Sequence, residues 1–339
     1  MDSKSICYIL FSYVPTPTDK DRSGRSPDEP IYCRYFSNLG IEIGIPFEAV
    51  VIPDFVVHCE RRDQAEFISL SNLNILVTEP KHLFAVCVAP IFGKEPKWLA
   101  LAELIEHYRL QGATYFYVYV KDIDDYSNIL LKDYARTDDA EIIYLHDNFS
   151  RHDVLWQKVE LQECIVRARG HSHWVAFIDI DETILMTRFE GTIADYLRQV
   201  SDPGIGGLKF RQQWVLRNES LPKRYVNDKQ LAEWMQTRRY HNTSRVAHAG
   251  YASKCILDPQ KVCLHIHSEV NVIICLLLRQ YRNVNSGTWR QTMLPALERM
   301  GNFSMTDYPE KLQQQLTFNV QRRVASVYSN ESLEQLKNR

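Results

Sequence analysis

The sequence predicts an α/β fold with a mostly parallel central sheet, flanking helices and a small β region before it. Between residues 83 and 180, apolar runs of strand length alternate with segments whose apolar residues recur at helical spacing. The run 174–180 is almost continuously apolar, which is typical of a strand buried on both faces. Strands that alternate with helices imply parallel neighbours joined by right-handed crossovers.

The regular part of the chain begins at residue 83. The expected strands are 83–88, 115–120, 141–145 and 174–180, and the expected helices are 98–108, 126–134 and 154–168. Gly112 and Gly170 follow the first and third helices, where glycine ends a helix without steric cost. Beyond 205 the spacing is irregular. There we expect strands at 206–215 and 261–267 and a helix at 288–299.

Composition marks the ends of the domain. Residues 15–30 are rich in Pro, Ser and charged residues, so we expect a disordered lead-in over 1–30. Short apolar runs in 31–80 indicate a small antiparallel β region. We expect a single domain over 31–325, followed by a polar tail at 326–339.

The charge balance does not indicate a polyanion-binding chain. The 339 residues include 40 basic and 42 acidic side chains, a formal net charge of −2, without a basic tail. Nothing therefore predicts a nucleic acid partner. The apolar runs Ile6–Val14 and Val272–Leu278 are far shorter than the roughly 20 residues of a membrane span. The N-terminus also lacks a signal-peptide pattern, so we expect neither export signal nor membrane span in this sequence.

Cysteines and glycosylation patterns bear on the compartment. The eight cysteines form no C-x-x-C pair, which argues against a zinc ribbon. Dispersed cysteines suit either an oxidising compartment or buried thiols, and both interpretations stay open. N-glycosylation patterns begin at Asn148, Asn218, Asn242, Asn302 and Asn330. They favour a secretory lumen.

The sharpest motif closes the last regular strand, in the stretch 174–182. Asp179 and Asp181 lie two residues apart, so on an extended chain both point to one side. Ligands of open parallel sheets bind beyond the carboxyl ends of the strands. Two close carboxylates repel unless a cation lies between them, and Mg²⁺ or Mn²⁺ can bridge carboxylates to phosphate oxygens. The motif thus suits a departing nucleoside diphosphate, with a solvated strand end as the alternative.

The same residues fit a phosphatase motif. The stretch 179–183 matches the D-x-D-x-T pattern of haloacid-dehalogenase-type phosphatases, with Asp179 as nucleophile and Asp181 as general acid. That fold also needs acidic residues downstream for Mg²⁺, and the later aspartates are isolated. Three β-α units precede the motif, whereas such a strand normally comes early. The phosphatase is therefore the weaker alternative.

Further stretches become specific when they are taken together and in order. They are Tyr32–Phe36, Phe55–Cys59, Glu95–Leu99, Glu103–Gly112, Leu155–Gln157, Trp174–Glu182 and Lys254–Pro259. From about residue 31 to about residue 320, the chain resembles glycosyltransferase family 92. The resemblance implies a GT-A fold, with a Rossmann-like nucleotide half at 81–185 and an acceptor half at 186–325.

The resemblance also implies an activity. Such enzymes transfer a sugar, typically galactose, from a UDP-sugar to a glycan acceptor, with inversion and with Mn²⁺ (or Mg²⁺). Members usually work in the Golgi behind an N-terminal membrane anchor, so membrane association is expected only through an anchor that this sequence does not contain. A non-catalytic glycan-binding protein of the same fold is a further alternative, although the intact pair of aspartates counts against it.

The resemblance assigns roles around the metal. Asp181 is the expected direct ligand, and Asp179 would hold the metal through water or bind the ribose. His267 is the candidate third ligand, on the same face of the strand 261–267 as His265. Lys254 would offset the charge of the diphosphate.

Four loop residues and one helical residue are candidates for the nucleotide. Ala89 and Pro90 follow the first regular strand, where a loop commonly lies against the nucleobase. Asp122 and Asp124 follow the second strand and are candidates for binding uridine. Gln157 lies on the helix that leads to the aspartates.

Inverting transfer needs a general base for the acceptor hydroxyl. The candidates are Glu219, Asp228, Glu233 and Asp258, among which the sequence does not choose. Phe210, Trp214 and Trp234 are candidates for stacking on sugar rings, although aromatic residues at this spacing more often belong to a core.

Overall fold

The structure is a computed structural model in which the chain forms two compact units. One unit comprises 1–80 with 260–266, and the other comprises 81–259 with 267–339. The structure describes residues 7–10, 30–37, 41–51, 56–60, 62–71, 80–93, 95–145, 153–202, 205–248, 254–261, 271–285 and 287–328.

The smaller unit contains two three-stranded antiparallel sheets. Their strands, in spatial order, are β1 (Cys7–Leu10), β5 (Val56–Cys59) and β4 (Val50–Val51), and β3 (Phe47–Glu48), β2 (Tyr32–Phe36) and β6 (Phe67–Ser71). A disulfide between Cys33 and Cys59 joins β2 to β5, with 5.7 Å between the Cα atoms. Tyr35 and Val57 are buried beside it. The predicted β region before the main sheet is confirmed.

Strand β1 corrects the predicted lead-in. Cys7–Leu10 pair with Val56–Cys59, whereas a disordered lead-in was expected over 1–30. An apolar run that is too short to cross a membrane is long enough for an edge strand, because strands need only a few residues.

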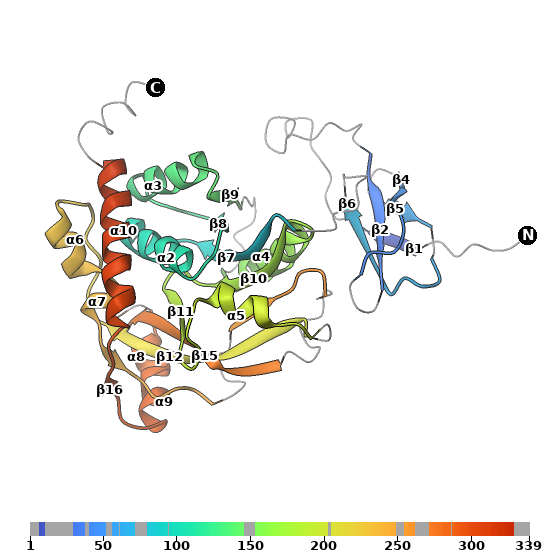
Figure 1. The fold of residues 1–339 in the computed structure, drawn as a ribbon. Coiled ribbons are helices and arrows are strands. Elements are labelled where there is room, and N and C mark those ends of the chain that lie inside the picture. Colours follow the sequence, from blue (N-terminus) through green and yellow to red (C-terminus); the bar gives the residue numbers. More distant parts are fainter. Residues whose placement is uncertain are drawn as a thin grey trace, which may run out of the picture. The chain divides into compact units, whose positions relative to one another are not determined.

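The larger unit is built around the parallel strands that the sequence predicts (Figure 1). Strands β10 (Ser172–Ile178), β7 (His82–Ile91), β8 (Tyr115–Val120) and β9 (Ala140–Tyr144) are parallel neighbours in that order. Helices α2 (Trp98–Leu110), α3 (Asp125–Arg136) and α4 (Asp153–Ala168) connect them. The predicted order of strands and helices in this region is confirmed.

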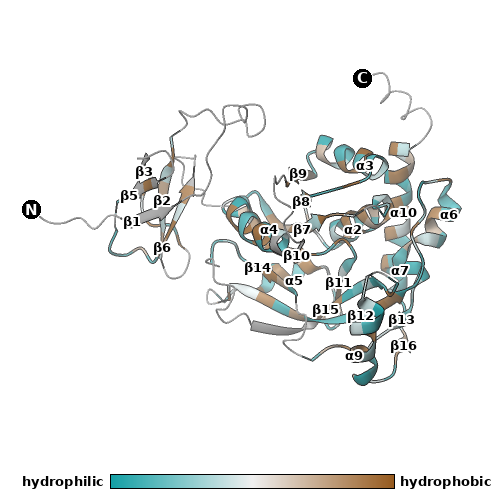
Figure 2. Cartoon of the chain, turned by 180° about the vertical axis from the view of Figure 1, so that it is seen from behind, coloured by the Kyte–Doolittle hydropathy of each residue, from teal (hydrophilic) through white to brown (hydrophobic). Residues whose placement is uncertain are grey.

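Alternating side chains place helices on both faces of this sheet. Phe84, Val86 and Val88 of β7 belong to the core that also contains Trp98 of α2. The next residue positions face the other way, because side chains alternate along a strand. There Cys87 forms a disulfide with Cys164 of α4. Figure 2 shows both brown and teal turns on α3 and α4, as expected for helices with one buried face.

Beyond β10 the sheet becomes mixed. The path continues through β14 (Lys254–Leu257), β12 (Gly207–Arg217), β15 (Asn271–Asn283) and β11 (Glu182–Met186), with short β13 (Asn242–Thr243) and β16 (Ser304–Met305) off this path. Only β12 and β15 are parallel in this half. The α/β class is confirmed, but the mostly parallel character holds for the first half alone, because β14 enters antiparallel to β10.

One predicted element of the second half lies almost wholly outside the described residues, and another differs from the structure. The strand predicted at 261–267 lies almost wholly outside the described residues, which end at Lys261 and resume at Asn271. The helix predicted at 288–299 is divided into α8 (Trp289–Thr292) and α9 (Leu294–Arg299). Pro295 explains the break, because it has no N–H to donate to the carbonyl four residues earlier.

The C-terminal helix α10 (Glu310–Tyr328) is absent from the sequence prediction. Leu316, Val320, Val324 and Val327 recur at helical spacing and are buried. The predicted tail at 326–339 therefore starts inside this helix. No helix in the described part of the chain has the length and hydropathy needed to cross a bilayer.

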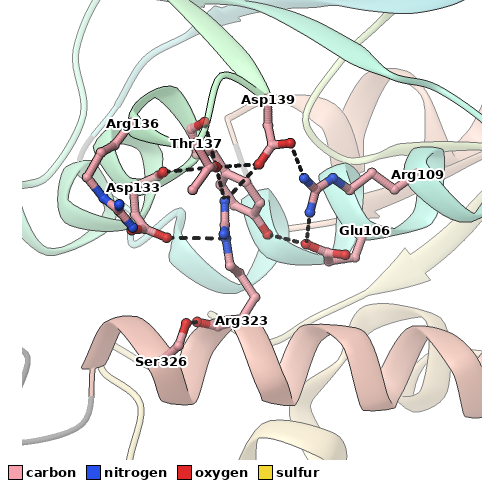
Figure 3. A network of polar contacts seen from close by, with 9 residues as sticks. Glu106, Arg109, Asp133, Arg136, Thr137, Asp139, Arg323 and Ser326 are labelled. Atoms are coloured by element: carbon pink, nitrogen blue, oxygen red, sulfur yellow. Dashed lines mark hydrogen bonds and ion pairs between the residues drawn. The ribbon is translucent and has the colours of Figure 1, made fainter.

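A network of charged side chains fastens α10 to α2 and α3 (Figure 3). The Arg323 guanidinium lies 3.3 Å from the Asp133 carboxylate and 3.2 Å from that of Asp139. It also lies 4.0 Å from the ring centre of Tyr134. Arg109 of α2 pairs with Asp139 on the other side. One arginine of α10 thus balances two carboxylates on or just beyond α3.

Candidate active site

The motif residues lie in a tight turn beyond the carboxyl end of β10. The Glu182 N–H donates to the Asp179 carbonyl at 3.0 Å, and the Asp179 N–H donates to the Glu182 carboxylate at 2.7 Å. β10 ends at Ile178, before both aspartates. The prediction that Asp179 and Asp181 share one face of a strand is therefore wrong. The turn directs their carboxylates into different surroundings.

Asp179 lies in a charged cluster with Lys254 of β14. The Lys254 ammonium is 2.8 Å from the Asp179 carboxylate and 3.2 Å from that of Glu182, which is 1% exposed. Burial disfavours the ammonium, but Glu182 and Asp179 outweigh it and raise the pKa of Lys254. Burial, followed by Asp179, raises the pKa of Glu182. The cluster therefore holds a charged lysine between these two side chains.

Glu160 of α4 belongs to the same surroundings and is missed by the sequence analysis. Its side chain is buried, and Oε1 has no hydrogen-bond partner among the described residues. Burial raises the pKa of Glu160 to about 8, and Lys254 and Asp179 act on it with opposite signs. Only its place on the helix before the motif strand could have drawn attention to it.

Asp181 faces a cavity instead. Its Oδ1 accepts a hydrogen bond from Gln280 at 3.4 Å, and Oδ2 lies 3.9 Å from the Arg282 guanidinium. Burial, and then the charge of Asp179, raises the pKa of Asp181. The carboxylate is 16% exposed. It is thus a desolvated anion whose charge a bound cation would stabilise.

The cavity has a volume of about 130 Å³ and brings together segments far apart in sequence. It is lined by Glu95, Pro96, Lys97, Ala100, Ile180, Asp181, Arg217, Leu221, Gln236, Arg282 and Asn283. The cationic side chains among them are one lysine and two arginines, and the acidic ones are Glu95 and Asp181. A site of this kind can hold an anion and a cation side by side.

The two arginines come from neighbouring strands of the second half. Arg217 ends β12, and Arg282 lies next to the end of β15, where the register pairs Arg217 with Asn283. Sequence analysis missed both arginines. Their positions at strand ends were a signal, but the pairing that places them together was not visible.

Lys97 is held at the start of α2 by the next β-α unit. Its N–H donates to the Ser127 hydroxyl at 2.8 Å and to the Asp124 carboxylate at 3.4 Å. Asp124 also accepts the Ser127 N–H at 2.9 Å as N-cap of α3. Burial lowers the pKa of Lys97. The geometry thus gives Asp124 a supporting position under the cavity wall.

The residues predicted near the nucleobase are placed differently from one another. Ala89 and Pro90 lie inside β7, because that strand continues to Ile91. Asp122 is exposed beyond β8, and its N–H donates to the Ile91 carbonyl at 3.0 Å. Phe92 comes directly after Ile91, the last residue of β7, and is 42% exposed. An exposed aromatic residue and an exposed acid therefore follow the ends of two parallel strands whose ends are joined by a backbone hydrogen bond.

Gln157 and the four candidate bases do not line the cavity. Gln157 is half-buried on α4. Glu219 accepts two hydrogen bonds from Arg239, at 2.7 and 3.1 Å, and the Arg239 hydrogen bond lowers its pKa. Such an ion pair makes Glu219 a weak base.

The other three candidates also lie elsewhere. Asp228 and Glu233 are exposed on α6 (Asp228–Trp234), and Asp228 accepts a hydrogen bond from Tyr225 at 2.8 Å. Asp258 is buried just beyond β14.

The candidate stacking aromatics belong to the interior. Phe210 is fully buried in the main core and Trp214 is 2% exposed in a second one. Trp234 lies half-buried with the Arg239 guanidinium 4.0 Å from its ring centre. Phe210 and Trp214 therefore serve packing, and no open aromatic face is left on them for a sugar.

His267, the candidate third metal ligand, lies outside the described residues. Within the described part of the chain, no group of three or more His, Cys, Asp or Glu side chains could hold a metal ion. Metal ions beside phosphates commonly use one or two protein carboxylates and take other oxygens from the substrate. Asp181 is one carboxylate on the cavity wall that could take part in such a site.

Glu103 of α2 supports the cavity wall from below. Its buried carboxylate accepts the N–H groups of Gln236 and Thr237, at 2.8 and 3.2 Å, and the Thr237 hydroxyl at 2.9 Å. It thereby caps the first turn of α7 (Gln236–Arg239), and Gln236 lines the cavity. Burial raises the pKa of Glu103 to about 7.

This raised pKa predicts a pH-dependent stability difference. Relative to Glu103→Gln, the wild type should lose stability as pH rises from about 4.5 to about 7, because only the unfolded carboxyl releases its proton there. The loss should reach roughly 3 kcal/mol. Urea unfolding of both proteins at pH 5 and pH 8 measures it. A difference in unfolding free energy that stays constant with pH would contradict this prediction.

A family profile decides the broader assignment. The profile described as "Glycosyltransferase family 92" matches residues 82–316. The chain belongs to glycosyltransferase family 92. The resemblance stated from the motifs is thereby confirmed, and the family favours the glycosyltransferase over the phosphatase alternative.

Solved structures give remoter likenesses to this family 92 glycosyltransferase. S. aureus TarS 1-349, solved in complex with UDP-GlcNAc, is 14% identical over 76% of each chain, with a TM-score of 0.33. Mannosyltransferase PcManGT from Pyrobaculum calidifontis, solved with GDP-Man and Mn²⁺, is 10% identical over 77% of this chain and 80% of that one, with a TM-score of 0.34. HddC from Yersinia pseudotuberculosis is 12% identical over 65% of this chain and 100% of that one, with a TM-score of 0.34. Comparison with curated proteins gave no match.

Proposed function

We propose that this glycosyltransferase moves a sugar, galactose by family resemblance, from a UDP-sugar to a glycan acceptor with inversion. The observation that carries the proposal is the cavity that Asp181 lines together with Arg217, Arg282 and Lys97. Departure of a nucleoside diphosphate builds negative charge on phosphate oxygens. Fixed cations that face those oxygens lower the free energy of the transition state.

The arginines suit the diphosphate by geometry. A guanidinium can donate two parallel hydrogen bonds to one phosphate group, and this fixes its orientation. Arg282 is 39% exposed and lies 3.9 Å from Asp181, too far for a tight ion pair. Its guanidinium can therefore turn to a phosphate while it stays within reach of Asp181. When bound at Asp181, Mn²⁺ or Mg²⁺ would neutralise further phosphate charge.

The nucleobase has a candidate place beside the cavity. Phe92 offers an exposed ring and Asp122 an exposed carboxylate, at adjacent ends of β7 and β8. Uracil has a flat face that can stack and an N–H that a carboxylate can accept. This keeps Asp122 in its proposed role, whereas Asp124 serves mainly as a helix cap.

Two observations support work in the Golgi lumen. The disulfides Cys33–Cys59 and Cys87–Cys164 occur in different units, and disulfides persist in oxidising compartments. Asn218, Asn242 and Asn302, which begin glycosylation patterns, are exposed. Of the cysteines that the structure describes at side-chain level, Cys255 is the one that stays free. We therefore propose a lumenal, N-glycosylated enzyme.

Calorimetric titration of UDP tests the proposed function. We expect UDP to bind with a Kd in the micromolar range when Mn²⁺ is present, and at least tenfold more weakly after chelation, since the metal would hold the diphosphate. GDP and CDP serve as controls for recognition of the nucleobase. If UDP does not bind to folded protein in the presence of Mn²⁺, the proposal is wrong.

A further inference from the structure

We propose that Glu95 is the catalytic base that takes the proton from the acceptor hydroxyl. This inference rests on the proposed function and assigns the role that inverting transfer leaves open. A base must be a proton acceptor on the wall of the cavity where the donor reacts. In the described part of the chain, the acidic residues that line the cavity are Glu95 and Asp181.

Asp181, the proposed metal ligand, is unsuited to act as the catalytic base as well. Its carboxylate lies between Gln280 and Arg282, beyond the strand end where the donor diphosphate is proposed to lie. A carboxylate bound to a cation is a poor proton acceptor, because the cation stabilises its charged form. This leaves Glu95 as the acidic residue on the wall that can act on the acceptor.

The position of Glu95 suits contact with an incoming substrate. It lies in the loop between β7 and α2, and its side chain is 49% exposed, so both the cavity and solvent reach it. Its Oε2 lies 3.7 Å from the Arg217 guanidinium, a distance that orients the carboxylate without a short ion pair. The Lys97 ammonium donates to the Glu95 carbonyl at 2.6 Å and fixes the backbone. The loop thus presents a defined carboxylate.

The charges on the cavity wall suit separate roles for Glu95 and Asp181. Arg217 lies next to Glu95, and Arg282 lies next to Asp181, so each carboxylate has a cation beside it. Arg217 can therefore face the diphosphate, and its distance of 3.7 Å from Glu95 leaves that carboxylate without a short ion pair.

The proposed step balances in a single displacement. The acceptor O–H gives its proton to the Glu95 carboxylate, and the oxygen electron pair forms a bond to the anomeric carbon of the donor. The bond from that carbon to the phosphate oxygen breaks, and its electron pair leaves with UDP. The configuration at the anomeric carbon inverts, and Glu95 later returns its proton to water.

Glu95→Gln tests the role, because glutamine keeps the shape and loses the basicity. UDP release is measured from UDP-galactose and other UDP-sugars, with a mixture of released N-glycans as acceptors and with water alone. We expect kcat to fall about 10² to 10⁴-fold while the Kd for UDP with Mn²⁺ changes less than about threefold. The decline of kcat/KM at acidic pH, caused by protonation of the base, should disappear in the variant. Glu95→Asp should recover part of kcat.

Glu298→Gln is the matched control, because Glu298 is an exposed acid of α9 that does not line the cavity. An active Glu95→Gln enzyme, or one that loses UDP affinity in place of kcat, overturns the assignment. A loss of kcat of this size in Asp228→Asn or Asp258→Asn, while Glu95→Gln stays active, also overturns it. A wild type that binds UDP and Mn²⁺ but turns over no UDP-sugar also overturns it. Absence of UDP binding would instead refute the proposed function itself.

Discussion

Replacing Asp181 by asparagine should weaken Mn²⁺-dependent UDP binding by at least roughly 100-fold, or about 2.7 kcal/mol. The carboxylate is the acidic side chain of the aspartate motif that faces the cavity, and asparagine removes its charge with little change of shape. The charge-assisted contact to a divalent cation is lost, and Arg282 loses the carboxylate that lies 3.9 Å from it. Calorimetric titration of UDP with Mn²⁺ measures the change.

Asp179→Asn makes an informative comparison. Asp179 pairs with Lys254 at 2.8 Å and does not line the cavity, so its loss should act mainly through the turn that it shares with Glu182. We expect a smaller drop in UDP affinity and a larger drop in unfolding free energy than for Asp181→Asn. Asp228→Asn, an exposed change outside the cavity, should leave UDP binding unchanged. Equal UDP affinity in wild type and Asp181→Asn would refute the metal site.

Replacing Arg323 by methionine should lower the free energy of unfolding by about 3 kcal/mol. Arg323 is 16% exposed and balances Asp133 and Asp139, whose side chains are 18% and 21% exposed (Figure 3). Methionine retains most of the side-chain length and leaves these two carboxylates close together with less positive charge. The contact of the guanidinium with Tyr134 is lost as well. Urea unfolding at neutral pH measures the loss.

Arg322→Met provides the control on the same helix. Arg322 is exposed, and its guanidinium lies 5.8 Å from the exposed Phe318 ring. Its replacement should change the unfolding free energy by less than about 0.5 kcal/mol. Equal effects of the two substitutions would mean that the network does not fasten α10. Because the network lies apart from the cavity lining, the Kd for UDP of folded Arg323→Met should stay near the wild-type value.

Local patterns in the sequence were enough to predict the parallel half of the fold. Apolar residues that recur with periods of two and 3.6 residues within short windows predict these elements. They are strands β7, β8, β9 and β10 and helices α2, α3 and α4. The same local signal located Asp179 and Asp181 at a strand end, and the ordered motifs identified the family. Local patterns suffice there because short connections join each element to the next one along the chain.

The residues that face the cavity depend on contacts between segments that are distant in the sequence. Arg217 and Arg282 lie 65 residues apart, and the parallel register of β12 and β15 brings them to one wall. The predicted equivalence of Asp179 and Asp181 failed for a related reason. Residues 179–182 form a hydrogen-bonded turn, and Lys254 from a distant strand attracts one carboxylate while the other faces the cavity. Strand register and long-range ion pairs depend on contacts between distant segments, and no short window of sequence contains that information.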